Sequence, residues 1–367
     1  MKSTLWGAAL AVAQVSCAVA QDGPPPGAMP PGGMPPPGAM AQINLGNAGL
    51  MASYYNADYF GTVQFRSGNG RAAIGAADEP GAPQSGYKDK ATSLVVPLNL
   101  MHALPDGQSY LRFNLTGTLA DGADELVEMD GPITRLEAQY LTFPDPNTMY
   151  AAGIFVEKTD LEIIGAGTLV REGIGLRFDM LKKFNDHWGM SARAEYSWGE
   201  TDLSLDIGPG MVLQHVQGDD RLYLQTELVG TFTAEDSGMV PQGWVMHPAF
   251  GALFQRSYLE TTANSFGAPS SGVVGDTEDY GLIWGHLRYE KKVAPGQWAP
   301  NFTLGLEHEV VNDLDALTQD STFAVIGAGV SRQQMNGNRV DLSVLRHQGL
   351  SGESYSQTLL AAFIMNF

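Results

Sequence analysis

The chain is dominated by segments in which apolar and polar residues alternate with a period of two. In the segment 188–198, every second residue from Trp188 to Trp198 is apolar or aromatic, whereas the intervening positions include Arg193 and Glu195. Successive side chains of a β-strand point to opposite faces, so this period predicts strands with one apolar and one polar face. Because the pattern recurs from about residue 54 to the end of the chain, we expect an all-β protein.

The alternating segments are about ten residues long, which is the length that a tilted strand needs to cross a lipid bilayer. About fourteen strands are expected, or about twelve if one weak pair is discarded. Their predicted ranges are 54–66, 92–101, 110–119, 134–143, 149–157, 171–182, 188–198, 221–232, 247–259, 281–292, 301–311, 323–332, 338–347 and 354–367.

The polar faces carry charges of both signs in strand after strand. They are Arg112, Arg135, Glu137, Arg177, Asp179, Arg193, Glu195, Arg221, Glu227, Arg288, Glu290, Glu307, Arg339 and Asp341. These charges would be very costly in the core of a soluble sandwich. After the first twenty residues no apolar run reaches the length of a transmembrane helix, and only closed barrels otherwise span lipid. The pattern therefore predicts a transmembrane antiparallel β-barrel of about 12 to 14 strands, with these charges facing the lumen.

Two interpretations of the lumen-facing charges remain open. They could form a salt-bridged ladder that fills or stiffens the barrel, or they could line a pore and set its ion preference. Both can hold at once.

The connections alternate between short and long, as expected for periplasmic turns and external loops. Short turns near 105–107, 144–147, 185–186 and 336–337 fall on the side of a periplasmic C-terminus. The longer stretches 67–91, 120–133, 158–170, 199–220, 260–280 and 312–322 fall on the external side. Two connections break the pattern, because 233–246 is long for a periplasmic turn and 348–353 is short for an external loop.

The N-terminal region predicts export. Residues 1–20 have the positive start, apolar centre and Ala18-Val19-Ala20 cleavage site of a signal peptide. Cleavage removes Cys17, the one cysteine, so the exported chain has no disulfides. Residues 21–50 form a Pro/Gly/Met-rich linker, and 51–367 are assigned to the barrel. The net charge of −19 argues against nucleic acid as a partner.

No chemistry-bearing motif appears in the sequence. Nucleophile elbows, HExxH, CxxC and P-loops are absent, and the seven histidines have no ligand spacing. We therefore expect no enzymatic activity, cofactor or metal site. The acidic segment of Asp121, Asp124, Glu125, Glu128 and Asp130 is either a solvated loop or a bridge through divalent cations to lipopolysaccharide.

The last strand, Tyr355 to Phe367, resembles the C-terminal strand of bacterial outer-membrane β-barrels, in which a terminal Phe is the usual assembly signal. The segments Ala324 to Ser331, Asn336-Gly337 and Arg339 to Arg346, followed by that strand, resemble the translocator barrel of the autotransporter family. The resemblance implies a bacterial outer-membrane location, contact with lipopolysaccharide, and assembly by the barrel-assembly machinery through Phe367. Members of the family have twelve-stranded barrels and usually carry a large passenger, whereas only a short Pro-rich segment precedes this barrel.

We therefore expect a passive channel or translocator barrel with little or no passenger. The alternative is a structural or adhesive surface protein with a plugged lumen, acting through its external loops.

Overall fold

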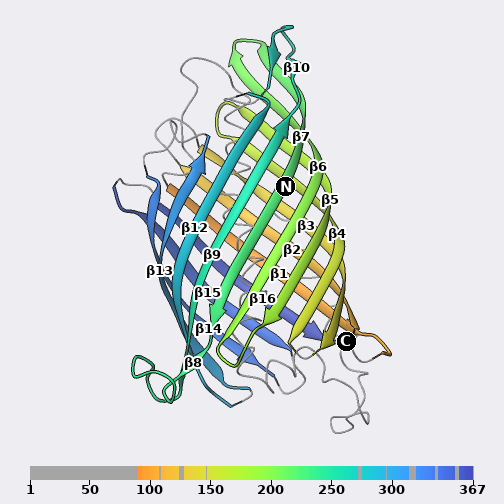
Figure 1. Cartoon of the computed structure of the whole chain (residues 1–367). Helices are drawn as coiled ribbons and strands as arrows, with labels where there is room; N and C mark the ends of the chain where they lie inside the picture. The colour runs from red at the N-terminus through yellow and green to blue at the C-terminus, as the bar shows by residue number, and fades with distance from the viewer. Residues whose placement is uncertain are drawn as a thin grey trace.

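Thirteen long strands close into one barrel in the part of the chain that the structure describes. The computed structural model describes residues 90–366 apart from 107–108, 124–127, 146, 272–274, 295, 314–319, 335–337 and 352–354. Figure 1 shows the strands tilted steeply around the barrel. Several predicted features lie outside the described residues: the signal peptide, the Pro-rich linker, the strand at 54–66, the turn at Asn336-Gly337 and the terminal Phe367.

The strands follow one another around the barrel almost in chain order. The barrel strands are β1 (Lys90–Ala103), β2 (Ser109–Ala123), β3 (Glu128–Asp145), β4 (Thr148–Ile163), β5 (Gly167–Lys183), β6 (Trp188–Gly208), β7 (Met211–Gly230), β9 (Trp244–Leu259), β12 (Thr277–Lys291), β13 (Trp298–Asn312), β14 (Thr322–Gln333), β15 (Arg339–Gly349) and β16 (Tyr355–Asn366). Three two-residue strands lie beside them: β8 (Phe232–Thr233), β10 (Thr262–Ala263) and β11 (Pro269–Ser270).

Neighbouring strands are antiparallel except at one seam. There β1 and β16 run parallel, in a register that begins with Lys90 opposite Tyr355. An odd number of alternating strands must bring two strands of the same direction together, which is the reason for this seam. The thirteen strands confirm the predicted class and lie within the expected range of 12 to 14.

The two faces of each strand have opposite character. On β5 the outward Ile174, Leu176 and Phe178 are 54%, 52% and 46% exposed, whereas the inward Arg177 and Asp179 are 3% and 2% exposed. A soluble protein would bury the first set and expose the second. The barrel is thus apolar outside and polar inside, as a membrane-spanning barrel must be.

Aromatic side chains mark both edges of the apolar outer belt. On β6, Trp188 and Trp198 lie on the outer face ten residues apart, where Trp198 packs edge-on against Tyr196 at 5.0 Å. Ten residues of a strand tilted by about 40° rise about 25 Å, which matches the apolar band of an outer-membrane barrel. Trp188 packs edge-on against Phe232 at 5.7 Å, and the rings of Trp244 and Phe302 stack at 5.7 Å. These rings are placed as interfacial girdles would be.

We call the end of the barrel at which β16 terminates the lower rim and the opposite end the upper rim. The expected short turns around 105–107, 144–147 and 185–186 connect strands at the lower rim. The long connection 231–243, which includes β8, also lies there, at the bottom of Figure 1. The structure thus keeps this connection on the side of the short turns, although it is longer than they are.

At the upper rim, three of the predicted external loops are wrong. The ranges 120–133, 158–170 and 199–220 are mostly strand, because β2 to β7 continue well past the apolar belt. β6 and β7 have 21 and 20 residues and are joined by a turn at Pro209-Gly210, where Gly210 has a φ of 75° that suits glycine. The backbone N–H and C=O groups of these extensions are paired between the two strands. The extensions therefore remain β-strands, although they contain polar residues and glycines of low strand propensity.

Candidate functional site

The candidate site is a ladder of charged side chains on the inner face of β2 to β7. Its contacts skip over strands: Arg177 of β5 reaches Glu137 of β3 at 2.6 Å, and Arg171 of β5 reaches Asp219 of β7 at 3.0 Å. Side chains can bridge second neighbours in this way only from the concave side of a barrel. We call this network the inner ladder.

The centre of the ladder is the group around Glu137. Its carboxylate receives hydrogen bonds from Arg177 at 2.6 and 2.8 Å and from Arg135 Nε at 2.5 Å. Arg135 also pairs with Glu195 Oε1 at 2.9 Å, and its guanidinium lies 3.7 Å from the centroid of the Phe155 ring. Three arginines surround Glu137 when Arg112 is included, at 3.9 Å. Paired groups of this kind can be buried without leaving an isolated charge.

The upper part of the ladder is organised by Asp219. This carboxylate is 0% exposed and accepts hydrogen bonds from Arg171 Nε at 3.0 Å, Arg221 Nε at 2.9 Å and the Thr201 hydroxyl at 3.1 Å. Arg171 donates a further bond to Glu157 at 3.0 Å. Glu157 also lies 3.5 Å from Arg135, so the upper and central parts are one network.

The lower part of the ladder is organised by Asp179. It accepts hydrogen bonds from Arg193 at 2.8 Å, from Arg177 at 2.7 Å and from the Gln139 amide at 2.7 Å. The chain of contacts continues from Gln139 to Arg112 at 2.6 Å. At its end, Arg112 donates to the Asn99 side chain on β1 at 2.7 Å.

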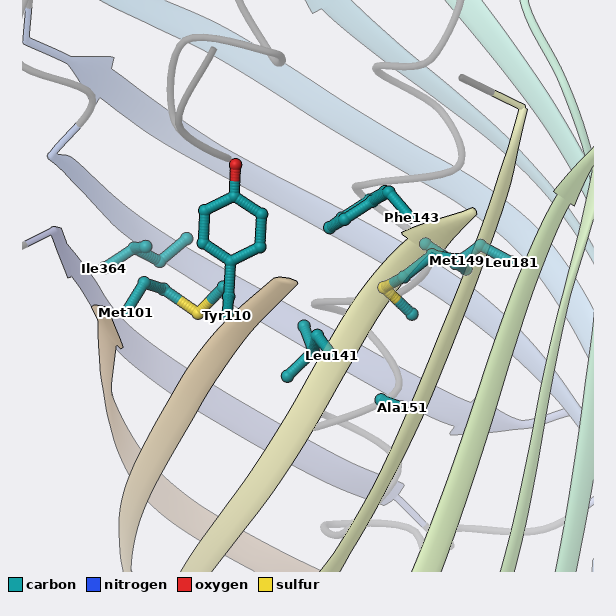
Figure 2. Close-up of a cluster of buried hydrophobic side chains, with 8 residues drawn as sticks. All are labelled: Met101, Tyr110, Leu141, Phe143, Met149, Ala151, Leu181 and Ile364. Atoms are coloured by element: carbon teal, nitrogen blue, oxygen red, sulfur yellow. The ribbon is translucent and has the colours of Figure 1, made fainter. Parts of the chain in front are cut away.

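Below the ladder the inner face becomes apolar. Figure 2 shows eight buried side chains from β1, β2, β3, β4, β5 and β16: Met101, Tyr110, Leu141, Phe143, Met149, Ala151, Leu181 and Ile364. The rings of Tyr110 and Phe143 meet edge to face at 5.6 Å. We call this group the apolar layer. It lies next to the lower rim, so the ladder and the layer divide the inner face into two zones.

A second inward group lies on β7 and β12. Glu227 accepts two hydrogen bonds from Arg288, at 3.0 and 2.8 Å, and one from the indole N–H of Trp284 at 2.7 Å. Glycine makes room for this indole, because a Cβ at Gly251 would lie 2.1 Å from the Trp284 ring.

The third inward group joins β12, β13 and β15. Glu307 Oε1 lies 3.5 Å from His286 Nε2 and 3.2 Å from His347 Nε2, and all three side chains are buried. Within the described residues, no three His, Asp or Glu side chains are placed to hold a metal ion.

The structure places the sequence-predicted lumen candidates on the inner face but distributes them among separate groups. Six of them join in the ladder: Arg112, Glu137, Arg177, Asp179, Arg193 and Glu195. Arg288 pairs with Glu227, and Glu307 lies between the two histidines. Glu290 accepts a bond from Ser331 at 3.1 Å, and Arg339 pairs within its own strand with Asp341 at 2.7 Å.

Three central members of the ladder were missing from the sequence prediction: Glu157, Arg171 and Asp219. Each has the inward parity of its strand, but Glu157 and Arg171 lie at the very ends of the ranges 149–157 and 171–182, and Asp219 precedes 221–232. Glu157 and Arg171 could have been found by carrying the inward parity to the terminal residue of each range, and Asp219 by extending its range by two residues. The histidines could not have been paired with Glu307, because their contact depends on the register of three strands.

The opposite wall of the barrel carries many short side chains between smaller charged groups. On β13 to β16 the inward positions include Thr303, Gly327, Ser331, Ser343 and Thr358, together with the Glu307–His347 and Arg339–Asp341 groups described above. The inner face is therefore asymmetric, with one continuous charged network on one wall and separate charged groups spaced by short side chains on the other.

No described helix is long and apolar enough to cross a membrane. The closed hydrogen-bonded barrel, its apolar outer belt and its polar inner face together define a transmembrane β-barrel.

Comparison with protein-family models and with curated proteins finds no match. Among solved structures, the chain is similar to the β-domain of the Bordetella autotransporter BrkA, with a TM-score of 0.54 and 12% identity over 70% of this chain and 96% of that chain. It is also similar to the translocator domain of the autotransporter NalP from Neisseria meningitidis, with a TM-score of 0.49 and 12% identity over 63% of this chain and 79% of that chain. At this level of identity the likeness to the BrkA domain establishes the fold alone: the chain forms a barrel like that of the BrkA β-domain.

Proposed function

We propose that the protein is a bacterial outer-membrane barrel that acts as a passive channel, of the translocator type but with little or no passenger. The observation that carries this proposal is the asymmetric inner face, on which the continuous inner ladder faces a wall of short side chains and separate charged groups. In such a barrel the short side chains leave room for a solute, and the charges on both walls set its preference. No enzymatic step is part of the proposal.

In this proposal the upper rim faces the outside and the lower rim faces the periplasm. The cleaved signal peptide delivers the chain to the envelope, and Phe367 serves as the signal for the barrel-assembly machinery. The charges of the inner ladder and of Glu290, Arg339 and Asp341 line the path. Lipopolysaccharide surrounds the upper half of the apolar belt.

Single-channel conductance of the refolded mature protein in a planar bilayer tests the proposal. A steady conductance is expected, and it should fall in the Ser343→Trp variant, which places an indole on the short inner wall. The matched control is Leu342→Trp, because Leu342 is the neighbouring outward residue and is 40% exposed on the lipid side. A folded barrel that stays silent, or equal conductance in the two variants, would refute the channel.

A second candidate is an adhesive surface protein with a plugged lumen. It is favoured by the protrusion of β6 and β7 above the upper rim, beside β10 at the top of Figure 1. This protrusion exposes Ile207, Met211 and Val212 by 42%, 49% and 48%, and Phe266 in the adjacent β10–β11 connection is 56% exposed. It is held in place by the bond from Ser265 N to Gln214 O at 2.8 Å. A silent, correctly folded barrel would support this candidate.

A further inference from the structure

The outer face of β3 to β6 has a sharp boundary between an apolar row and a polar row. Leu136, Val156, Ile174 and Trp198 lie side by side across the four strands, because each is registered opposite the next. They are 51%, 47%, 54% and 47% exposed. One step nearer the upper rim, Thr134, Lys158, Glu172 and Glu200 form the second row in the same registers. The change from one row to the next places the upper edge of the bilayer at this level.

The two rows line a groove of about 840 Å³, which we call the outer groove. Gly173 and Gly199 also line it, between the two rows; a Cβ at either position would point to the inner side, toward the Arg171 guanidinium. The volume is that of a site for part of a large ligand. The groove therefore offers an apolar half at the depth of acyl chains and a charged half at the depth of headgroups.

The charged half has a defined pattern of signs. Lys158 donates to Glu172 at 2.6 Å, and both side chains are largely exposed, at 53% and 67%. Glu172 is registered directly opposite Glu200. Like charges directly opposite one another destabilise a sheet, and the single charge of Lys158 does not balance both carboxylates, so a second cation beside the pair would be stabilising. A ligand that brings an anion for Lys158, a cation for the two carboxylates and an acyl chain for the apolar row matches the whole groove.

We propose that the outer groove binds lipopolysaccharide, with a phosphate on Lys158 and an acyl chain on the row from Leu136 to Trp198. The divalent counter-ions that accompany the lipid phosphates satisfy Glu172 and Glu200. The proposal deepens the outer-membrane location proposed above and rests on the upper rim being the external side.

Binding of purified lipopolysaccharide to the full mature protein in detergent micelles tests the assignment, with calcium present and again with EDTA. Lys158→Gln should weaken binding about tenfold, because a charge-assisted hydrogen bond is lost. The matched control is Lys182→Gln. Lys182 lies on β5 near the lower rim, is 41% exposed and pairs with Asp145 at 3.8 Å. The control should bind within about twofold of the unaltered protein.

Two further measurements distinguish lipopolysaccharide from other lipids as the ligand. EDTA should weaken binding to the unaltered protein, and phosphatidylethanolamine in place of lipopolysaccharide should compete poorly. Equal affinity of Lys158→Gln and Lys182→Gln, or equal competition by phosphatidylethanolamine, would overturn the assignment.

Heat-modifiable gel mobility checks that each variant is a folded barrel. Conductance measured in bilayers free of lipopolysaccharide keeps the two proposals apart. A silent barrel that still binds through Lys158 refutes only the channel, whereas a conducting barrel with no such binding refutes only the groove.

Discussion

Asp219 is the position at which loss of a single charge should disturb the barrel most. It is fully buried and holds Arg171 and Arg221 together, with Arg171 Nε at 3.0 Å and Arg221 Nε at 2.9 Å from its oxygens. Replacement by Asn keeps the shape of the side chain and removes the charge. The two guanidinium groups would then share an amide that cannot balance them.

Removing one partner from a buried ion pair costs about 3–5 kcal/mol. Arg171 keeps its bond to Glu157 at 3.0 Å in the Asp219→Asn variant, so the lower end of that range applies. We therefore expect a loss of about 3 kcal/mol in the free energy of unfolding, or roughly a hundredfold in the equilibrium constant. The ladder should loosen first around β5 and β7, which carry the two arginines.

The adjacent residue provides the control. Asp220 is on the outer face and accepts weaker bonds from the Tyr196 hydroxyl and from Gly199 N, both at 3.2 Å. Asp220→Asn makes the same chemical change one residue away and should cost about 1 kcal/mol or less. Reversible urea unfolding in detergent, followed by circular dichroism and gel mobility, measures both variants. Equal losses would refute the view that the inner ladder is a buried, mutually dependent network.

Two further predictions concern packing and pH. Gly251→Ala should cost about 1–3 kcal/mol in the same unfolding assay, because its Cβ would lie 2.1 Å from the buried Trp284 ring, whereas Gly117→Ala, with nothing within 4 Å, should be nearly neutral. At the lower rim, the backbone and hydroxyl hydrogen bonds from Thr233 lower the pKa of Asp236 below its usual value. Their contribution is present above the unfolded pKa of about 4 and is lost as the pH falls through the folded pKa, so the protection of the Thr233 amide, relative to its intrinsic exchange rate at each pH, should fall in acid, and Asp236→Asn should remove this pH dependence.

The sequence predicted the strands and their faces well because both follow from a local period. All thirteen described barrel strands overlap a predicted range, and inward residues such as Arg177 and Glu195 were identified from parity alone. The predicted β2 to β7 stop too early at the upper rim. Beyond the membrane, a strand continues only where a neighbouring strand pairs with it, and a single strand's sequence does not show this. Asp219 was missed for that reason, whereas Glu157 was inside its predicted range and was overlooked at the end of it.

Contacts between strands could not be predicted in the same way. The parallel seam of β1 and β16 depends on the number of strands that close the barrel, which local alternation does not determine. The meeting of Glu307 with His286 and His347 depends on three separate registers. The outer groove likewise appears only when four strands are aligned, because each strand alone contributes one apolar and one polar residue to it.

The places where alternation fails also carry information about the interior. Leu360 and Ile364 are apolar residues at inward positions of the last strand, and taken alone they weaken the strand pattern. In the barrel, Leu360 packs with Val95 and Ala362, and Ile364 belongs to the apolar layer. An inward apolar residue is favourable only where inward neighbours are also apolar, so these exceptions mark the zone in which the charged ladder ends. A solute crossing the proposed channel would meet the ladder and the apolar layer in succession, and a hydrophobic constriction resists ions more than a charged one does. On that side of the lumen the layer should therefore resist ions, whereas Glu290, Arg339 and Asp341 on β12 and β15 offer them a charged path near the same rim.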